Sequence, residues 1–253
     1  MRSNLNKNWN NFLNTMSFMS RIPVKVEYPA EMKLVFFPLS GLIIASIVFL
    51  SHFILAVIFS HEITALLLLG LYVYLTGALH LDGLGDFFDG YFADRDREKT
   101  VQIMHDSNSG IYAVVALILV LILKYLLFKE LLIESKLEFL LIIGVMARFY
   151  AAAALGFFKA AEASVWAKSV EDNAKKIDVF HSFLLSLIIL SFIFLIFGGQ
   201  FLKTLFTAAV ISTGLVYYLA NWSEKKIGGI TGDLCGTIIE LTEIVFLITA
   251  AIF

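Results

Sequence analysis

The chain has 253 residues, of which 59% are hydrophobic and only 16% are charged, and its mean hydropathy is +0.85. Long apolar runs recur along its length, which excludes an ordinary water-soluble globule and predicts an all-α, polytopic membrane helical bundle. The formal net charge of −2 selects no class of partner, and we expect no nucleic-acid binding. The single cysteine, Cys235, excludes an intramolecular disulfide.

The first 33 residues are expected to form a cytoplasmic or interfacial segment ahead of the bundle. They lack the apolar core of a signal peptide. Residues 4–19 alternate polar side chains with Trp9, Phe12 and Met16, a pattern typical of an amphipathic helix lying at the membrane interface. No linker or low-complexity segment follows, so we expect a single membrane-embedded domain over 1–253.

Hydrophobic runs of about 20 residues, the length that crosses a bilayer, follow this segment. They lie at 34–58, 63–81, 111–133, 137–158, 179–198, 201–220 and 234–253. A tight hairpin at Gly199-Gln200 must join the fifth run to the sixth. With a cytoplasmic N-terminus, fourteen of the 19 Lys and Arg residues fall on the cytoplasmic side and three on the other. This asymmetry predicts about seven transmembrane helices with the N-terminus in the cytoplasm.

The stretch from 77 to 110 holds seven of the chain's 21 acidic residues between two apolar runs. Asp82, Asp86 and Asp89 are spaced i, i+4 and i+7, so on a helix they share one face and repel one another unless a cation neutralises them. Mg²⁺ prefers carboxylate oxygens, so we expect these three to be metal ligands and Asp82 also to be catalytic. The alternative is a solvated helix extension whose acids face water.

Two histidines accompany these acids. His80 points away from Asp82 on a helix, and it is either a substrate-binding residue or a histidine hydrogen-bonded in the interior. His105 and Asp106 are candidate catalytic residues, His105 for moving a proton and Asp106 as a base or a further ligand. Capping of the next helix is the alternative for Asp106. The glycines of the stretch permit close approach of a ligand or of another helix: Gly77, Gly83, Gly85 and Gly90.

A second polar cluster, GGITGDLCGTIIELTE, occupies 228–243 at the start of the last run. Its glycines precede a helix N-terminus, whose N–H groups and positive dipole end suit an anion. Thr231, Gly232 and Asp233 are therefore candidate substrate-binding residues.

Two glutamates of the same cluster, Glu240 and Glu243, lie well inside the apolar helix. A charge there costs at least ~2.5 kcal/mol and requires a partner. Arg148, in the middle of the fourth run, is the basic candidate. The three residues are interpreted either as substrate-binding or as a structural ion pair.

These motifs resemble those of the cobalamin synthase family, the adenosylcobinamide-GDP ribazoletransferases. The resemblance rests on TGALHLDGLGDFFDG, MHDSNSGIYAV and GGITGDLCGTIIELTE, with SRIPV and FFPLSGLIIA similar to the family's opening, and it covers nearly the whole chain. The family has a TADG-like end to the first motif where this chain has FFDG, which retains all three aspartates. It also has a basic residue where this chain has Asn108, which removes a cation at that position.

The resemblance implies an inner-membrane enzyme of the last steps of cobalamin biosynthesis, with its active site facing the cytoplasm. It would join adenosylcobinamide-GDP to α-ribazole or its 5′-phosphate and release GMP, with Mg²⁺ as cofactor. In this interpretation Asp82, Asp86 and Asp89 hold Mg²⁺ on the diphosphate, and Asp106 or His105 takes the hydroxyl proton.

The remaining candidate roles concern substrate binding and partners. The 231–233 turn would grip a phosphate, and Arg95, with Arg97 and Lys99, would steer anionic substrates. The expected partners are the corrinoid-GDP and α-ribazole substrates, the lipid bilayer, and either a homo-oligomer or a complex with other cobamide-assembly enzymes.

Three alternative functions account for parts of the same pattern. CDP-alcohol phosphotransferases require an Ala-Arg that Gly85-Asp86 does not supply, and intramembrane prenyltransferases carry a second aspartate-rich motif where this chain has glycines and glutamates. An ion-coupled transporter would use Glu240, Glu243 and Arg148 as a relay near the bilayer midplane. The main acids lie instead at the edge of a span, which favours an enzyme.

Overall fold

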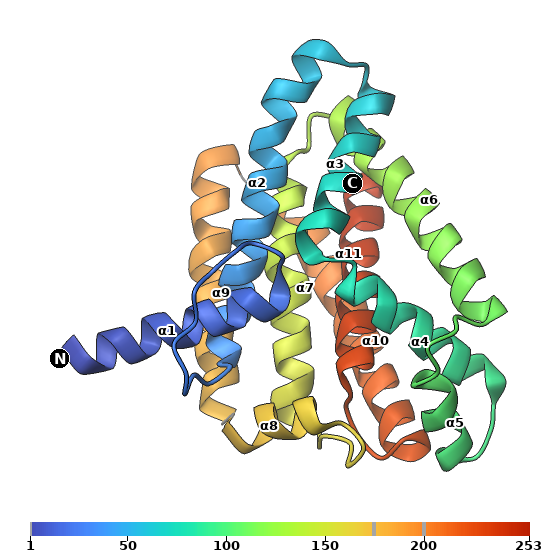
Figure 1. Cartoon of the computed structure of the whole chain (residues 1–253). Helices are drawn as coiled ribbons and strands as arrows, with labels where there is room; N and C mark the ends of the chain where they lie inside the picture. The colour runs from blue at the N-terminus through green and yellow to red at the C-terminus, as the bar shows by residue number, and fades with distance from the viewer. Residues whose placement is uncertain (1, 174–175, 199–200) are drawn as a thin grey trace.

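The computed structural model describes residues 2–173, 176–198 and 201–253, and within these ranges it contains helices and no β-strand (Figure 1). The predicted all-α fold is confirmed. In chain order the helices are α1 (Arg2–Met19), η1 (Leu34–Phe36), α2 (Phe37–Ile58), α3 (His61–Thr76), α4 (Leu79–Ala93), α5 (Arg97–Met104), α6 (Ile111–Ile133), α7 (Glu138–Phe157), α8 (Val165–Asn173), α9 (Lys176–Phe197), α10 (Leu202–Lys226) and α11 (Gly232–Ile252).

Six segments in the described ranges are long and apolar enough to cross a membrane: Leu34–Ile58, α6, α7, α9, α10 and α11. Helices α3 and α4 pass the same test only as a pair bent by 85°, which gives up to seven spans if the pair counts as one. The prediction of about seven spans is confirmed as six to seven candidate spans. The side of the membrane on which the N-terminus lies stays a prediction. The predicted hairpin at 199–200 lies outside the described residues.

The predicted continuous run at 63–81 is wrong in its last part. The chain leaves α3 at Gly77 (φ 64°) and Ala78 (φ 57°), both in the left-handed conformation that ends a helix and turns the chain. Arg21 packs on this turn, because its N–H donates to the carbonyl of Leu75 at 2.7 Å and its side chain lies against Gly77. The acidic motif therefore begins a separate helix, α4, that is directed away from the axis of α3.

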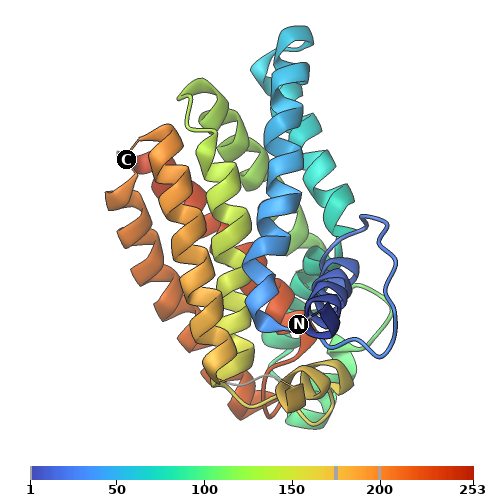
Figure 2. The same ribbon diagram turned by 90° about the vertical axis from the view of Figure 1, so that its left-hand side faces the viewer.

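Helices α7 and α11 form the centre of the bundle. Within their apolar windows 83% and 72% of residues are buried, against 22% to 33% in the other four spans. Helix α7 packs against α2, α9 and α11 (Figure 2). Its closest neighbour is α2, since a Cβ added to Gly41 would lie 1.9 Å from the carbonyl oxygen of Gly144. Small residues let two membrane helices approach to backbone contact in this way.

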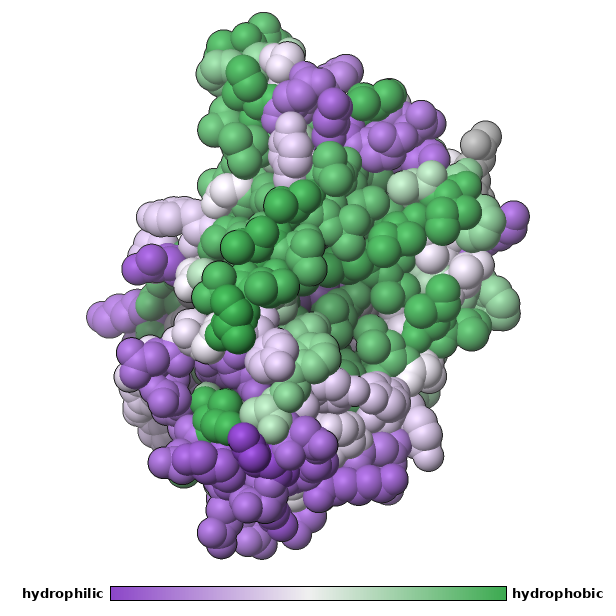
Figure 3. All heavy atoms as spheres, turned by 90° about the vertical axis from the view of Figure 1, so that its right-hand side faces the viewer, coloured by the Kyte–Doolittle hydropathy of each residue, from purple (hydrophilic) through white to green (hydrophobic). Residues whose placement is uncertain are grey.

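Polar elements gather at one end of the bundle. Helices α5 and α8 and the loop before α11 lie there, and α1 crosses the outside of the bundle nearby (Figures 1 and 2). Above this polar end, Figure 3 shows a broad apolar band on the face it presents, as expected for a surface that contacts lipid. The bundle therefore has one polar end at which the two sequence motifs can meet.

Gly144→Ala is expected to destabilise the fold by about 1–3 kcal/mol, because the added methyl group overpacks the α2–α7 contact. The change is measured by heating the purified protein in detergent and determining by size-exclusion chromatography the fraction that remains folded at each temperature. Gly214→Ala is the matched control, since a Cβ there meets no atom within 4 Å. Equal melting temperatures for the two variants would contradict the packing argument.

Candidate active site

Helices α4 and α11 cross at two glycines, and this contact brings the two polar motifs together. A Cβ on Gly83 would lie 2.7 Å from the Cα of Asp233, and a Cβ on Gly236 would lie 3.0 Å from the carbonyl oxygen of His80. The hydroxyl of Thr237 donates to the carbonyl of Gly83 at 3.2 Å. Here the glycine of the acidic motif serves close helix packing, the second of the two roles expected for it.

A cavity of about 730 Å³ opens beside this crossing. Its walls come from α4, the loop between α5 and α6, the start of α11, and helices α1 and α8. Eight of the predicted site residues line it: His80, Asp82, Asp86, His105, Asp106, Thr231, Gly232 and Asp233. Five others do not: Asp89, Arg95, Arg148, Glu240 and Glu243.

Three carboxylates line the cavity from two helices. Asp82 and Asp86 lie one turn apart on α4, and Asp233 packs against Gly83 of the same helix, so the three negative charges lie close together and repel one another. A cation relieves repulsion of this kind. No group of three His, Cys, Asp or Glu side chains in the described ranges forms a ready-made metal site. The donor set still fits Mg²⁺, which commonly takes one or two carboxylates and completes its shell with water and substrate phosphates.

Asp89 has partners that differ from those expected of a third metal ligand. Its two carboxylate oxygens accept hydrogen bonds from the backbone N–H groups of Gly110 (2.5 Å) and Ala113 (2.9 Å). These N–H groups belong to the first turn of α6, which has no other side-chain cap. Asp89 therefore ties α4 to the start of α6, and the helical spacing shared with Asp82 and Asp86 does not carry it into the cavity.

The loop between α5 and α6 places His105 and Asp106 at the cavity. One oxygen of Asp106 accepts from the backbone N–H and the side-chain amide of Asn108, both at 2.9 Å. The backbone hydrogen bond from Asn108 is the main reason that the pKa of Asp106 lies below its ordinary value. A carboxylate with a lowered pKa is a weaker base, which leaves His105 as the better candidate for proton transfer. The alternative of capping the next helix is not observed for Asp106, because its oxygen accepts from Asn108 and the N-cap residue of α6 is Gly110.

His80 is buried in the cavity wall, with 3% of its surface exposed. Its Nε2 atom has no hydrogen-bond partner in the described part of the chain, so the alternative of a fully hydrogen-bonded interior histidine is not observed. Nε2 is itself buried, and leaving a buried polar atom unsatisfied carries a free-energy cost.

The turn before α11 is held by backbone contacts. The N–H of Ile230 donates to the carbonyl of Lys159 at 2.8 Å, and the N–H of Ala161 donates to the carbonyl of Ile230 at 2.9 Å. The hydroxyl of Thr231 caps α11 by accepting from the N–H of Leu234 at 3.2 Å. This arrangement fixes the first turn of α11 beside the carboxylates.

The first two N–H groups of α11, those of Gly232 and Asp233, find no acceptor among the described residues. Both residues line the cavity. Unpaired N–H groups at the positive end of a helix suit a phosphate oxygen. The predicted phosphate site at 231–233 therefore has two unpaired donors at the helix start, and its role in binding phosphate stays a prediction.

Arg95 lies outside the cavity, on the exposed connection between α4 and α5. The neighbouring Arg97 packs its guanidinium against Gly228, which adopts a left-handed conformation (φ 89°). The steering role of Arg95 stays a prediction, whereas Arg97 also supports the turn before α11.

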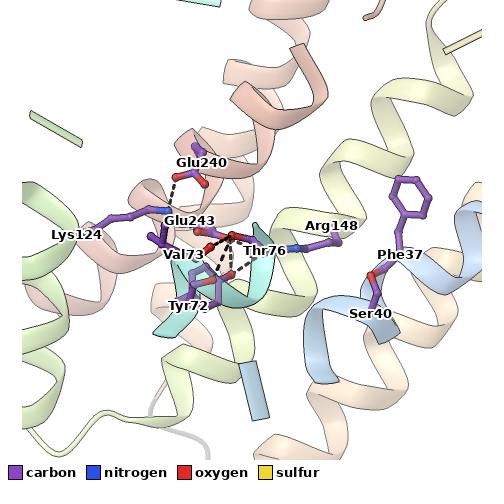
Figure 4. Close-up of polar contacts among 9 residues, drawn as sticks. All are labelled: Phe37, Ser40, Tyr72, Val73, Thr76, Lys124, Arg148, Glu240 and Glu243. Carbon is purple, nitrogen blue, oxygen red and sulfur yellow. Dashed lines mark hydrogen bonds and ion pairs between the residues drawn. The ribbon is translucent and has the colours of Figure 1, made fainter. Parts of the chain in front are cut away.

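Glu240 and Glu243 belong to a buried ionic network that lies further along α11 than the cavity, away from the polar end of the bundle (Figure 4). Lys124 of α6 bonds both glutamates, at 2.6 Å in the case of Glu243, and Arg148 of α7 bonds Glu243. The hydroxyl of Tyr72 on α3 donates to Glu243 at 2.5 Å and accepts from Arg148 at 2.6 Å. Two cations and two carboxylates thus balance within a network that joins four helices.

The sequence predicted this network only in part. The pairing of Arg148 with a glutamate is confirmed for Glu243, whereas Glu240 pairs with Lys124, which the sequence analysis did not consider. Arg148 and Glu243 have no exposed side-chain surface and do not line the cavity. This geometry favours the structural ion pair over the substrate-binding interpretation.

An aromatic pair at the cavity could not be predicted from the sequence. Phe18 of α1 and Trp166 of α8 stack with ring centroids 4.8 Å apart and an interplanar angle of 9°, and both line the cavity. Their positions in two amphipathic segments far from the acidic motif gave no signal of a shared site.

Comparison with known proteins supports one family. The family model described as cobalamin-5-phosphate synthase matches residues 11–251. The adenosylcobinamide-GDP ribazoletransferase from Clostridium acetobutylicum is 34% identical to this chain, and the match covers 92% of both chains. The enzyme of the same name from Acetivibrio thermocellus is also 34% identical, and the match covers 94% of this chain and 96% of the relative. The enzyme of the same name from Clostridium tetani is 35% identical over 92% of both chains. No solved structure matches.

Lys124→Met is expected to lower the free energy of unfolding by about 3–5 kcal/mol, because it leaves buried carboxylates without their cation. The double variant Lys124→Met/Glu240→Gln keeps the network neutral and should recover much of this loss. Thermal unfolding of the purified proteins in detergent measures both effects. If the double variant unfolds at a lower temperature than the single variant, charge balance does not hold this network together.

Proposed function

This chain belongs to the cobalamin-5-phosphate synthase family, and we propose that its cavity is the active site of an integral membrane ribazoletransferase. The enzyme joins adenosylcobinamide-GDP to α-ribazole or its 5′-phosphate and releases GMP. The observation that carries the proposal is the convergence of Asp82 and Asp86 on α4 with Asp233 on α11 at one cavity. Such a site suits a diphosphate substrate, because carboxylates can hold a cation that neutralises the phosphates, beside N–H donors for the phosphate oxygens.

The reaction exchanges one phosphorus–oxygen bond for another. A ribazole hydroxyl attacks the phosphorus attached to the corrinoid, and the bond from that phosphorus to the bridging oxygen breaks, so that GMP leaves with the bridging oxygen. The hydroxyl gives up its proton. The protein must therefore align the two substrates, accept a proton and stabilise negative charge on the phosphate oxygens.

Charge neutralisation is assigned to Asp82 and Asp86, which would hold Mg²⁺ against the diphosphate. When bound, the ion supplies charge stabilisation at the phosphate oxygens and on the leaving group. The first-turn N–H groups of Gly232 and Asp233 offer donors to a phosphate from the opposite helix. Asp89, with both oxygens bonded to α6, acts by holding α4 in place.

Proton transfer is assigned to His105. The support is that it lines the same cavity as Asp82, Asp86 and Asp233. His80, with its unpartnered Nε2, supplies a further polar contact for substrate. Arg95 and its basic neighbours would raise the local concentration of the anionic substrates without touching the reacting atoms.

The polar end of the bundle is proposed to face the cytoplasm, in the inner membrane of the cell. The support is the excess of Lys and Arg in the loops that lie on the side of the acidic motif. Soluble nucleotide substrates would then reach the cavity directly. Association with other cobamide-assembly enzymes, or with a second copy, belongs to the same proposal.

Asp82→Asn and Asp86→Asn are each expected to slow GMP release by about 10²–10³-fold, since each removes a carboxylate that would hold the cation against the diphosphate. Purified protein in liposomes is incubated with adenosylcobinamide-GDP, α-ribazole and Mg²⁺, and GMP is quantified by chromatography. Glu98→Gln, which alters an exposed acid on α5 outside the cavity, should retain wild-type turnover. Normal turnover by both aspartate variants would refute the assignment of the site.

Removal of divalent metal is expected to abolish turnover without unfolding the protein, because the bundle is held by helix packing and its own ion network. A chelator is added to the same assay, and Mg²⁺ in excess of the chelator should restore GMP release. The unfolding temperature, measured in parallel, should stay unchanged. Full turnover in the presence of the chelator would exclude the proposed magnesium.

A further inference from the structure

An apolar groove of about 470 Å³ lies between α7, α9 and α10 and shares no lining residue with the acidic cavity. Phe149 of α7, Phe183 of α9 and Val216 of α10 are among its walls. The hydroxyl of Tyr150, which also lines it, already donates to the carbonyl of Ala209 at 2.8 Å. The groove therefore offers a ligand chiefly hydrocarbon contacts.

The groove continues into a more polar depression along α10. Tyr217 borders both, and the depression, of about 410 Å³, is lined further by Tyr218, Asn221, Trp222 and Lys225. From the groove, past Tyr217, to the adjoining depression, the lining therefore changes from apolar to aromatic to cationic as α10 approaches its C-terminal end.

This order of residue types matches the depth profile of a bilayer leaflet. Tyr and Trp side chains favour the level of the lipid headgroups, and Lys at the surface attracts anionic headgroups. Lys225 is exposed and forms no ion pair with a described residue, whereas the adjacent Lys226 bonds Asp94 at 2.7 Å. Lys225 is thus free to bind an anion in the depression that adjoins the groove.

We propose that this surface binds one anionic phospholipid, with an acyl chain in the groove and the phosphate beside Lys225. Hydrophobic contact alone would hold any lipid chain, so the cation is the feature that selects the anionic class. The site is independent of the transferase reaction, because none of its residues lines the acidic cavity.

The test uses the full-length purified protein in phosphatidylcholine nanodiscs that contain a small fraction of photoactivatable phosphatidylglycerol. Peptides of α7, α9 and α10 that carry the label are quantified by mass spectrometry. Lys225→Ala should reduce this labelling about fivefold, the equivalent of about 1 kcal/mol per lysine at an anionic surface. Lys168→Ala, on an exposed position of α8 outside the groove, should leave labelling unchanged.

A second variant tests the apolar part. Ala153→Trp fills the groove, which Ala153 lines, and should reduce labelling while the melting temperature shows that the fold is kept. Unlabelled phosphatidylglycerol should compete with the probe more strongly than phosphatidylcholine does. Equal competition by the two lipids, or wild-type labelling of the Lys225→Ala variant, would overturn the proposal.

Discussion

The close crossing of α4 and α11 is the contact on which the candidate site depends. At Gly83 and Gly236 the two helices meet without intervening side chains, so that Asp82 and Asp86 of one helix lie across the cavity from the first turn of the other. A side chain at either glycine would separate the acids from the N–H groups that complement them. The two glycines therefore determine both how closely the helices pack and where the polar groups of the candidate site lie.

The ionic network, further along α11 than the cavity, connects the helix that forms this crossing to its neighbours in the bundle. Lys124 and Arg148 bind the glutamates two turns beyond the active-site end of α11, and Tyr72 connects them to the helix that precedes the bend. Burying four charges is costly, and the network is tolerable because the charges cancel and share hydrogen bonds. Its strength lies in fixing the register of α11 against three neighbours rather than in net stabilisation.

Features that depend on local pattern could be predicted from the sequence, and features that depend on tertiary partners could not. Hydropathy predicted the long spans, helical spacing grouped Asp82 with Asp86, and the glycine-rich turn before the last run indicated Asp233. The bend after α3 was missed because Gly77 and Ala78 continue an apolar run, and left-handed backbone leaves no trace in hydropathy. Asp89 repeats the helical spacing of its neighbours, yet the nearby start of α6 provides it with two donors.

The order of the buried charges along the chain has a consequence for membrane assembly. Lys124 and Arg148 precede Glu240 and Glu243, so during synthesis the two cations reach the bilayer before the carboxylates that neutralise them. Until α11 is in place, α6 and α7 carry uncompensated charge at membrane depth, which is costly. Insertion of the last helix therefore completes the charge balance of the bundle and, in the same step, brings Asp233 to the cavity.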